Sequence, residues 1–193
     1  MEEKANLLSR GRGMEFEPEK KMAEWVGRLM LVGARTAPKS RGQDELVLGL
    51  ITEEKEKEAL AREMEKVAER GKAYQFFKRD AENVRQAEAV VLIGLDFKRP
   101  VGVNCGACGF DCERILQVEK NEGDYQGPIC AMRLLDLGIA VGSAVSLARD
   151  HCVDNRVMYT IGVGARRLGL MNAQVVLGIP LSIKGKNIFF DRK

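Results

Sequence analysis

The sequence has one histidine, no block of like charge and no long apolar run, and each absence excludes a class of function. A single histidine among 193 residues, with dispersed carboxylates, offers no acid–base pair or catalytic triad. The 31 basic and 28 acidic residues are interspersed, which argues against nucleic-acid binding. The start MEEKANLLSRGRG is polar, and no stretch approaches the roughly 20 apolar residues of a membrane span. We therefore expect a cytoplasmic protein with no nucleic-acid or membrane partner.

Cysteine is too sparse for a disulfide framework. The chain has five cysteines, an odd number, whereas such frameworks belong to small secreted domains that lack a core. The composition, 45% hydrophobic and 31% charged, is that of a globular chain. We expect one domain over residues 1–193 that contains a cysteine-rich module at 100–130. Metal or redox chemistry is the better interpretation of the cysteines.

Hydrophobic periodicity predicts a mixed α and β architecture. Apolar residues at helical spacing alternate with short aliphatic runs that read as buried strands. The predicted helices cover residues 17–34, 53–71, 73–87, 132–151 and 155–168, and the predicted strands cover 45–51, 89–95 and 173–179.

Three cysteines lie close together in NCGACGFDC, and a fourth returns later. Cys105, Cys108 and Cys112 have a CxxCxxxC spacing, and Cys130 follows after seventeen intervening residues. Three close thiolates and one distant thiolate suit a [4Fe-4S] cluster, and the intervening glycines allow the positive φ angles that wrapping requires. Structural zinc is the main alternative, although zinc ribbons usually pair two short CxxC knuckles. A third interpretation is four chemically idle cysteines.

The fifth cysteine, Cys152, follows the only histidine, His151. We interpret Cys152 as a small buried hydrophobic residue and His151 as a residue near a helix end, where the helix dipole favours a cation. A role for either side chain as a substitute ligand is the alternative.

The cysteine segment resembles a known motif. VNCGACGFDCERI followed by GPIC is similar to the four-cysteine iron-sulfur motif of corrinoid and electron-transport proteins. That resemblance implies a [4Fe-4S] cluster on the four cysteines. It does not choose a function, because the motif serves electron transfer, radical chemistry and methyl transfer alike.

The order of segments outside the module resembles the nitroreductase family. The matching segments, in chain order, are GARTAPKSRGQ, ELVLGLI, AVVLIGL, DLGIAVGSAVSLA, GARRLGL and VVLGIPLS. Together with the cysteines, they resemble an uncharacterised group of prokaryotic ferredoxin-domain proteins over most of residues 20–193. The resemblance implies an α+β fold, with a mixed sheet flanked by helices and an inserted cysteine-rich iron-sulfur loop. It also implies a homodimer formed through the long central helix, with FMN at the interface.

The same resemblance implies flavin contacts on three segments. The loop after Ala37-Pro38 has Gly42 where an asparagine is common, so Gln43 would supply the amide. Ser9 and its neighbouring arginines are a shifted counterpart of the family's N-terminal phosphate motif, and the basic tail would complete a phosphate site. Ordinary surface cations are the alternative interpretation. The candidate contacts are Arg10, Arg12, Lys39, Ser40, Arg41, Gln43, Lys184, Lys186 and Arg192.

These patterns predict an iron-sulfur redox protein, either a flavin-linked oxidoreductase or an electron-transfer protein. In it, the cluster would pass single electrons to or from FMN, and the cofactors would supply the chemistry. The alternative is a cluster-only electron carrier or redox sensor on a flavin-free, nitroreductase-like dimer. The redox partner protein or small-molecule substrate does not follow from the sequence.

Overall fold

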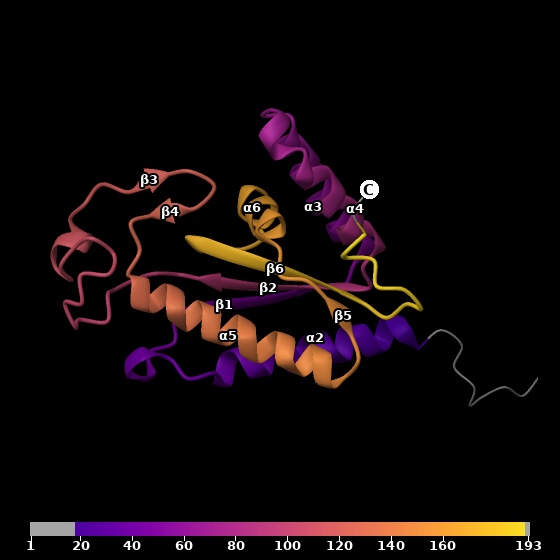
Figure 1. Cartoon of the computed structure of the whole chain (residues 1–193), viewed down its shortest axis with the longest axis horizontal. Helices are drawn as coiled ribbons and strands as arrows, with labels where there is room; N and C mark the ends of the chain where they lie inside the picture. The colour runs from indigo at the N-terminus through magenta and orange to yellow at the C-terminus, as the bar shows by residue number, and fades with distance from the viewer. Residues whose placement is uncertain (1–17, 192–193) are drawn as a thin grey trace, which may run out of the picture.

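The computed structural model describes residues 18–191 as an antiparallel sheet with helices on both faces (Figure 1). The four strands lie in the order β1-β2-β6-β5. At one end of the sheet Leu46 pairs with Leu95, which pairs with Val175, and at the other end Ile51 pairs with Val90. The α+β class predicted from the sequence is confirmed. The strands are β1 (Leu46–Ile51), β2 (Ala89–Leu95), β5 (Asp154–Asn155) and β6 (Val175–Ser182).

Every pairing between the described strands of this sheet is antiparallel, whereas the expected mixed sheet would include a parallel pair. The connection between β1 and β2 explains the direction. Two helices, α3 (Glu54–Ala68) and α4 (Phe76–Gln86), pack against each other there. The first carries the chain away from the end of β1 and the second brings it back, so β2 starts where β1 stops. A parallel neighbour needs a crossover that returns the chain to the opposite end.

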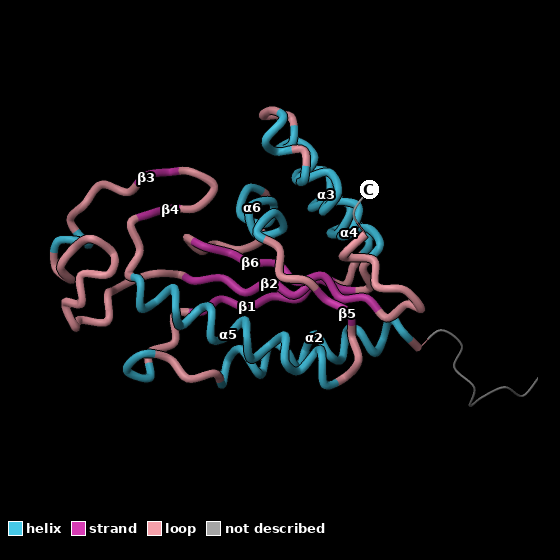
Figure 2. The backbone as a smooth tube through the Cα atoms, viewed as in Figure 1, coloured by secondary structure: helices cyan, strands magenta, loops and turns pink. Residues whose placement is uncertain are grey.

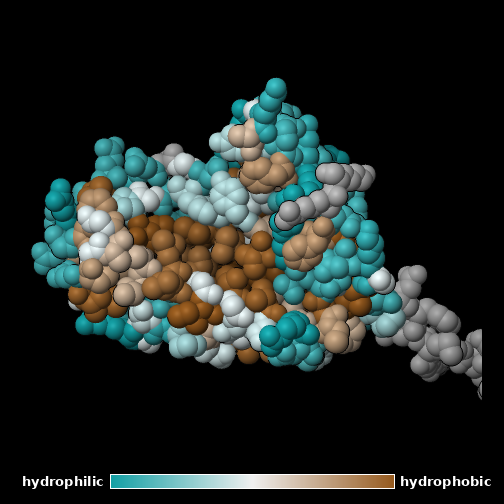
Figure 3. All heavy atoms as spheres, viewed as in Figure 1, coloured by the Kyte–Doolittle hydropathy of each residue, from teal (hydrophilic) through white to brown (hydrophobic). Residues whose placement is uncertain are grey.

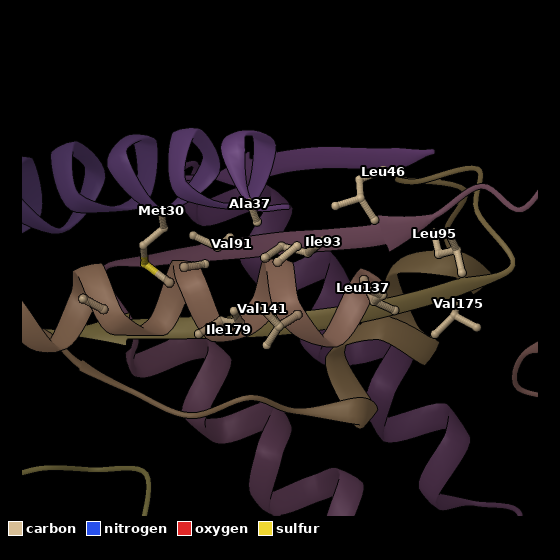
Figure 4. Packing of buried hydrophobic residues seen from close by; sticks show 14 of the residues in the cluster. Met30, Ala37, Leu46, Val91, Ile93, Leu95, Leu137, Val141, Val175 and Ile179 are labelled. Carbon is tan, nitrogen blue, oxygen red and sulfur yellow. The ribbon is translucent and has the colours of Figure 1, made fainter. Parts of the chain in front are cut away.

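Two helical layers cover the two faces of the sheet (Figure 2). One layer contains α2 (Glu19–Thr36) and α5 (Ala131–Asp150), and the other contains α3, α4 and α6 (Tyr159–Arg167). Successive side chains of a strand point to opposite faces. Val91 and Ile93 therefore pack against α2 and α5 (Figure 4), while Val90 and Leu92 pack against the other layer. Burial on both faces explains why β2 is apolar throughout.

Helix α6 lies directly on β6 because two glycines permit the contact. A Cβ added to Gly162 would lie 1.6 Å from the carbonyl oxygen of Val176, and one added to Gly178 would lie 2.0 Å from Ile161. The helix also begins at Tyr159 rather than at residue 155 as predicted. Asp154 and Asn155 instead pair with β6, and Met158 forms a bridge with Gly178.

Helix α5 is long and apolar enough to cross a membrane, contrary to the expectation that no segment would approach such a span. The core helix of a globular protein passes the same test. Here Leu137, Ala140 and Ala144 are buried in the cluster that joins α2, α5 and the sheet, while Leu135 and Ile139 are exposed on the opposite side. One side of α5 is therefore part of the core. The cytoplasmic location stays a prediction.

Candidate functional site

The cysteine module follows β2 and ends at the start of α5. It lies at one end of the molecule (Figure 1). Its regular elements are short: the 3-10 helix η3 (Arg114–Leu116) and a hairpin of β3 (Asn121–Glu122) and β4 (Gln126–Gly127). The loop character predicted for this segment agrees with this structure.

Turns close the cysteine loop upon itself. Asn104, Gly106 and Gly109 all have positive φ, a conformation that glycine adopts without strain. The amide of Gly109 donates to the carbonyl of Gly106 at 2.9 Å, and the amide of Cys112 donates to Asn104 Oδ1 at 2.8 Å. The positive φ angles expected at the two glycines are confirmed. The loop is therefore held by its own hydrogen bonds.

The four predicted ligands differ in burial. Cys105 is exposed, Cys108 and Cys112 are partly buried, and Cys130 is buried at the N-terminus of α5. Cys108 packs against the hydrophobic cluster that contains Cys130. Within residues 18–191, no three His, Cys, Asp or Glu side chains are grouped closely enough to hold a metal ion. The ligand set therefore stays a prediction, and cluster binding would require the loop to draw its thiols together.

The fifth cysteine is not the buried residue that we expected. Cys152 is exposed and has a φ of 58°, because the chain turns out of α5 at this point. His151 caps the C-terminal end of α5, as predicted, and its amide donates to Leu147 at 3.1 Å.

The tip of the module's hairpin is fixed to the helical layer by Asp124. Its carboxylate accepts a hydrogen bond from Arg70 at 2.6 Å and another from the hydroxyl of Tyr159, and its carbonyl accepts one from Arg166. Burial acts to raise the pKa of Asp124, but the hydrogen bonds from Tyr159 and Arg70 outweigh it and hold the pKa below its usual value. Burial also raises the pKa of Tyr159, and the bond to Asp124 adds to that rise.

The predicted flavin loop turns two of its polar side chains inward. Lys39 Nζ donates to the carbonyls of Ala34, Arg35 and Ala37 at 2.7 to 2.9 Å, so it caps the C-terminus of α2. The amide and hydroxyl of Ser40 both donate to Asp136 Oδ1 at 2.8 Å. These side chains stabilise the loop from within the protein, which is a different role from the one that the resemblance implied.

The rest of this loop surrounds a buried arginine that sequence reasoning missed. Gln43 Oε1 accepts a hydrogen bond from Arg133, whose side chain is 1% exposed. Arg133 also forms ion pairs with Asp136 at 3.2 Å and Glu45 at 3.7 Å. Arg41 is exposed, with a φ of 58°. The available signal was the Arg133 and Asp136 pair, three residues apart and followed by a stretch of α5 without charge up to Arg149.

The basic tail lies at the other end of the sheet from this loop. Lys184 donates to the carbonyl of Gln86 and pairs with Glu88 at 3.3 Å, and Lys186 pairs with Asp191 at 2.8 Å. The tail follows the end of β6 that pairs with the start of β2, whereas the loop precedes the opposite end of the sheet. The strands of this sheet span roughly 20 Å, so the loop cations and the tail cations of one chain do not meet in a single phosphate site. Arg10, Arg12 and Arg192 lie outside the described residues.

Comparison with known proteins identifies the family. A model described as "Uncharacterized protein containing a ferredoxin domain (DUF2148)" matches residues 126–192, a range that includes Cys130. An uncharacterised protein of Archaeoglobus fulgidus is 46% identical over 165 residues, which cover 85% of this chain and 88% of the relative. The chain belongs to this ferredoxin-domain family.

Solved nitroreductases share the fold of this ferredoxin-domain protein. A nitroreductase with bound FMN from Desulfitobacterium hafniense has a TM-score of 0.57 at 11% identity, covering 90% of this chain and 81% of its own. Bacillus megaterium NfrA1 has a TM-score of 0.54 at 14% identity, and nitroreductase A of Vibrio parahaemolyticus has 0.53 at 13%. This chain spans 61% and 62% of those two proteins. Such low identity shows the fold alone, so the predicted nitroreductase-like fold is confirmed.

The family and the fold together indicate a redox or electron-transfer function. The ferredoxin domain of the family indicates an iron-sulfur cofactor, and the structural neighbours include an FMN-binding protein.

Proposed function

We propose that this ferredoxin-domain protein is an iron-sulfur electron-transfer protein whose [4Fe-4S] cluster is held by Cys105, Cys108, Cys112 and Cys130. The observation that carries the proposal is that three of the thiols lie on one loop closed by its own hydrogen bonds, and that Cys108 on this loop packs against the hydrophobic cluster that contains the buried Cys130. Four thiolates are the usual ligands of such a cluster. The donor set therefore fits the group.

The chain's own residues would shape access to the cluster. Cys130 is 4% exposed and belongs to the hydrophobic cluster, so the inner side of the loop excludes water. Cys105 is exposed, so a redox partner could approach from the outer side. When bound, a [4Fe-4S] cluster accepts and donates single electrons, at a potential that solvent exposure and hydrogen bonds to sulfur adjust.

A flavin-linked oxidoreductase is the second candidate, favoured by the likeness to a nitroreductase with bound FMN. Two observations favour a protein that carries the cluster without FMN. Lys39 and Ser40 turn their side chains inward, and Lys184 lies far from their loop. A flavin phosphate would need donors from elsewhere, because charge-assisted hydrogen bonds are what hold phosphate.

We also propose a homodimer through the outer face of α5. Leu135 is 58% exposed and Ile139 is 45% exposed, and a Cβ at Gly138 or Gly142 would meet nothing within 4 Å. An apolar band runs over this part of the molecule (Figure 3). Burial of such a band against a second copy removes apolar surface from water, which favours association.

Individual cysteine-to-serine variants test the ligand set. Each variant should lower the iron content of anaerobically purified protein and weaken the broad visible absorption of the cluster; the four variants are Cys105→Ser, Cys108→Ser, Cys112→Ser and Cys130→Ser. Cys152→Ser is the matched control, since Cys152 is exposed and outside the proposed set, and it should retain full iron content. Iron retained in all four single variants would contradict the proposal. Acid-released FMN in the same samples would support the flavin-linked candidate.

A further inference from the structure

Arg133 is the most completely buried charged residue that the structure describes, with 0% of its surface exposed. Its guanidinium reaches two segments far apart in sequence. On one side Nε donates to the carbonyl of Arg99 at 3.2 Å. On the other side Nη1 donates to the carbonyls of Ser40 and Gln43, each at 3.3 Å. An arginine fork holds several acceptors in fixed directions, which the single ammonium of a lysine does not.

The first of these segments is the cysteine module. Arg99 stands where the chain enters the module, and Arg133 stands one helical turn beyond its exit at Cys130. The amide of Arg133 donates to the carbonyl of Cys130 at 3.0 Å, within the rigid first turn of α5. Arg133 thus joins the entry and the exit of the module, and a shift of Cys130 on binding a ligand would move Arg133 with it.

The second segment is the loop of residues 39–45. Besides Arg133, Asp136 on the next turn of α5 also binds this loop. Asp136 Oδ2 pairs with Arg133 at 3.2 Å, while its Oδ1 accepts both hydrogen bonds from Ser40. Glu45 closes the loop, with Oε2 3.7 Å from Arg133 Nε. The buried Oε1 of Glu45 has no hydrogen-bond partner among the described residues, and Arg99 Nε lies 3.8 Å away. This oxygen is therefore free to accept a hydrogen bond when the side chains around it shift.

We propose that Arg133 is a positioning residue that couples Cys130 to residues 39–45, so that the presence of the cluster sets the order of this loop. The inference rests on the proposed iron-sulfur function and extends it. Residues 39–45 would become more ordered when the cluster is present. They would then form part of a surface that only the cluster-loaded protein presents to its redox partner. Because coupling is reciprocal, a ligand on the loop would in turn alter the affinity for the cluster.

Hydrogen exchange on cluster-loaded and cluster-free wild-type protein tests the coupling. We expect residues 39–45 to exchange about fivefold or more faster when the cluster is removed, in the range of ordinary coupling between sites. Exchange of α6, on the other face of the sheet, is the internal reference and should not change. An iron assay on the same sample reports the cluster separately from the exchange rates.

Two variants cut the link at different points. Arg133→Lys keeps the charge and loses the fork, and Gln43→Ala removes the side-chain amide oxygen that accepts from Arg133 without touching the cysteines. Both should bind iron while the difference in exchange between loaded and cluster-free protein shrinks, and Arg133→Lys should abolish it. Arg149→Lys is the matched control on the same helix, because Arg149 is 75% exposed, and it should keep the full difference.

The outcomes separate the two hypotheses. Wild-type protein that binds no iron contradicts the proposed function and with it the coupling. Wild-type protein that binds iron, with residues 39–45 exchanging alike in both forms, contradicts the coupling alone. Variants that bind iron and keep the wild-type difference also overturn the role of Arg133.

Discussion

Ser40 and Asp136, 96 residues apart in the sequence, are joined by two hydrogen bonds of 2.8 Å to a single carboxylate oxygen. The other oxygen of Asp136 faces the buried Arg133. Loss of one partner from a buried ion pair is strongly destabilising, and loss of Asp136 also leaves both donors of Ser40 without their acceptor. We therefore predict that Asp136→Ala destabilises the protein by about 3 to 5 kcal/mol in chemical denaturation. Asp150→Ala, at the exposed end of the same helix, should change stability by less than about 0.5 kcal/mol.

The contact between α6 and β6 depends on Gly162. Alanine there would place a Cβ against the backbone of β6, which cannot move as a side chain can. We predict that Gly162→Ala costs about 3 kcal/mol of unfolding free energy, at the upper end of overpacking costs. Gly164→Ala in the same helix would place a Cβ 2.8 Å from Met64 Cγ and 3.0 Å from Leu60 Cδ1, so side chains rather than backbone have to shift, and it should cost less than Gly162→Ala. Equal costs for the two variants would contradict this account of the helix position.

The hairpin tip should respond to acid through Asp124. Its pKa is lower in the folded chain than in the unfolded chain, so the ionised carboxylate stabilises the folded state. This contribution is complete above the unfolded pKa, near 4, and is lost as the pH falls through the lower folded pKa. Asp124→Asn should destabilise the protein at pH 7 and reduce the loss of stability between pH 5 and pH 2, as measured by thermal unfolding. If Asp124→Asn and wild-type protein lose the same stability between pH 5 and pH 2, the hydrogen bonds of Asp124 contribute nothing to stability.

The proposed dimer depends on the exposed apolar face of α5. Ile139→Lys places a charge on this face and should shift the protein to monomers in sedimentation velocity, because burial of an unpaired charge is costly. Leu168→Lys is the control: Leu168 is 37% exposed at the end of α6, on the other face of the sheet, and this variant should sediment as wild type. Identical sedimentation of all three proteins would argue against α5 as the interface.

The regular elements were largely predictable because their signals are local. Strand β2 has the bounds predicted from its aliphatic run, since each of its residues is buried. The start of α6 was not predictable in this way, because the pairing of Asp154 and Asn155 depends on β6, which is distant in sequence. The exposure of Cys152 follows from its left-handed backbone conformation, which a cysteine in the sequence does not predict.

The candidate site was predicted in part. The positive φ angles at Gly106 and Gly109 follow from their place in a wrapping loop, and the structure has them. The inward contacts of Lys39 and Ser40 could not be read from the sequence, because surface loops usually turn polar side chains to water. Arg133 was missed because a charged residue is rarely buried without partners, and its partners other than Asp136 lie in segments distant in sequence.

Metal analysis of wild-type protein shows whether this chain holds an iron-sulfur cluster. Iron, acid-labile sulfide and zinc should be measured together on one anaerobically purified sample of known protein concentration. We predict about four iron and four sulfide per chain with negligible zinc. Protein that contains about one zinc per chain, with neither iron nor sulfide, would contradict this prediction and make the cysteine module a structural zinc site.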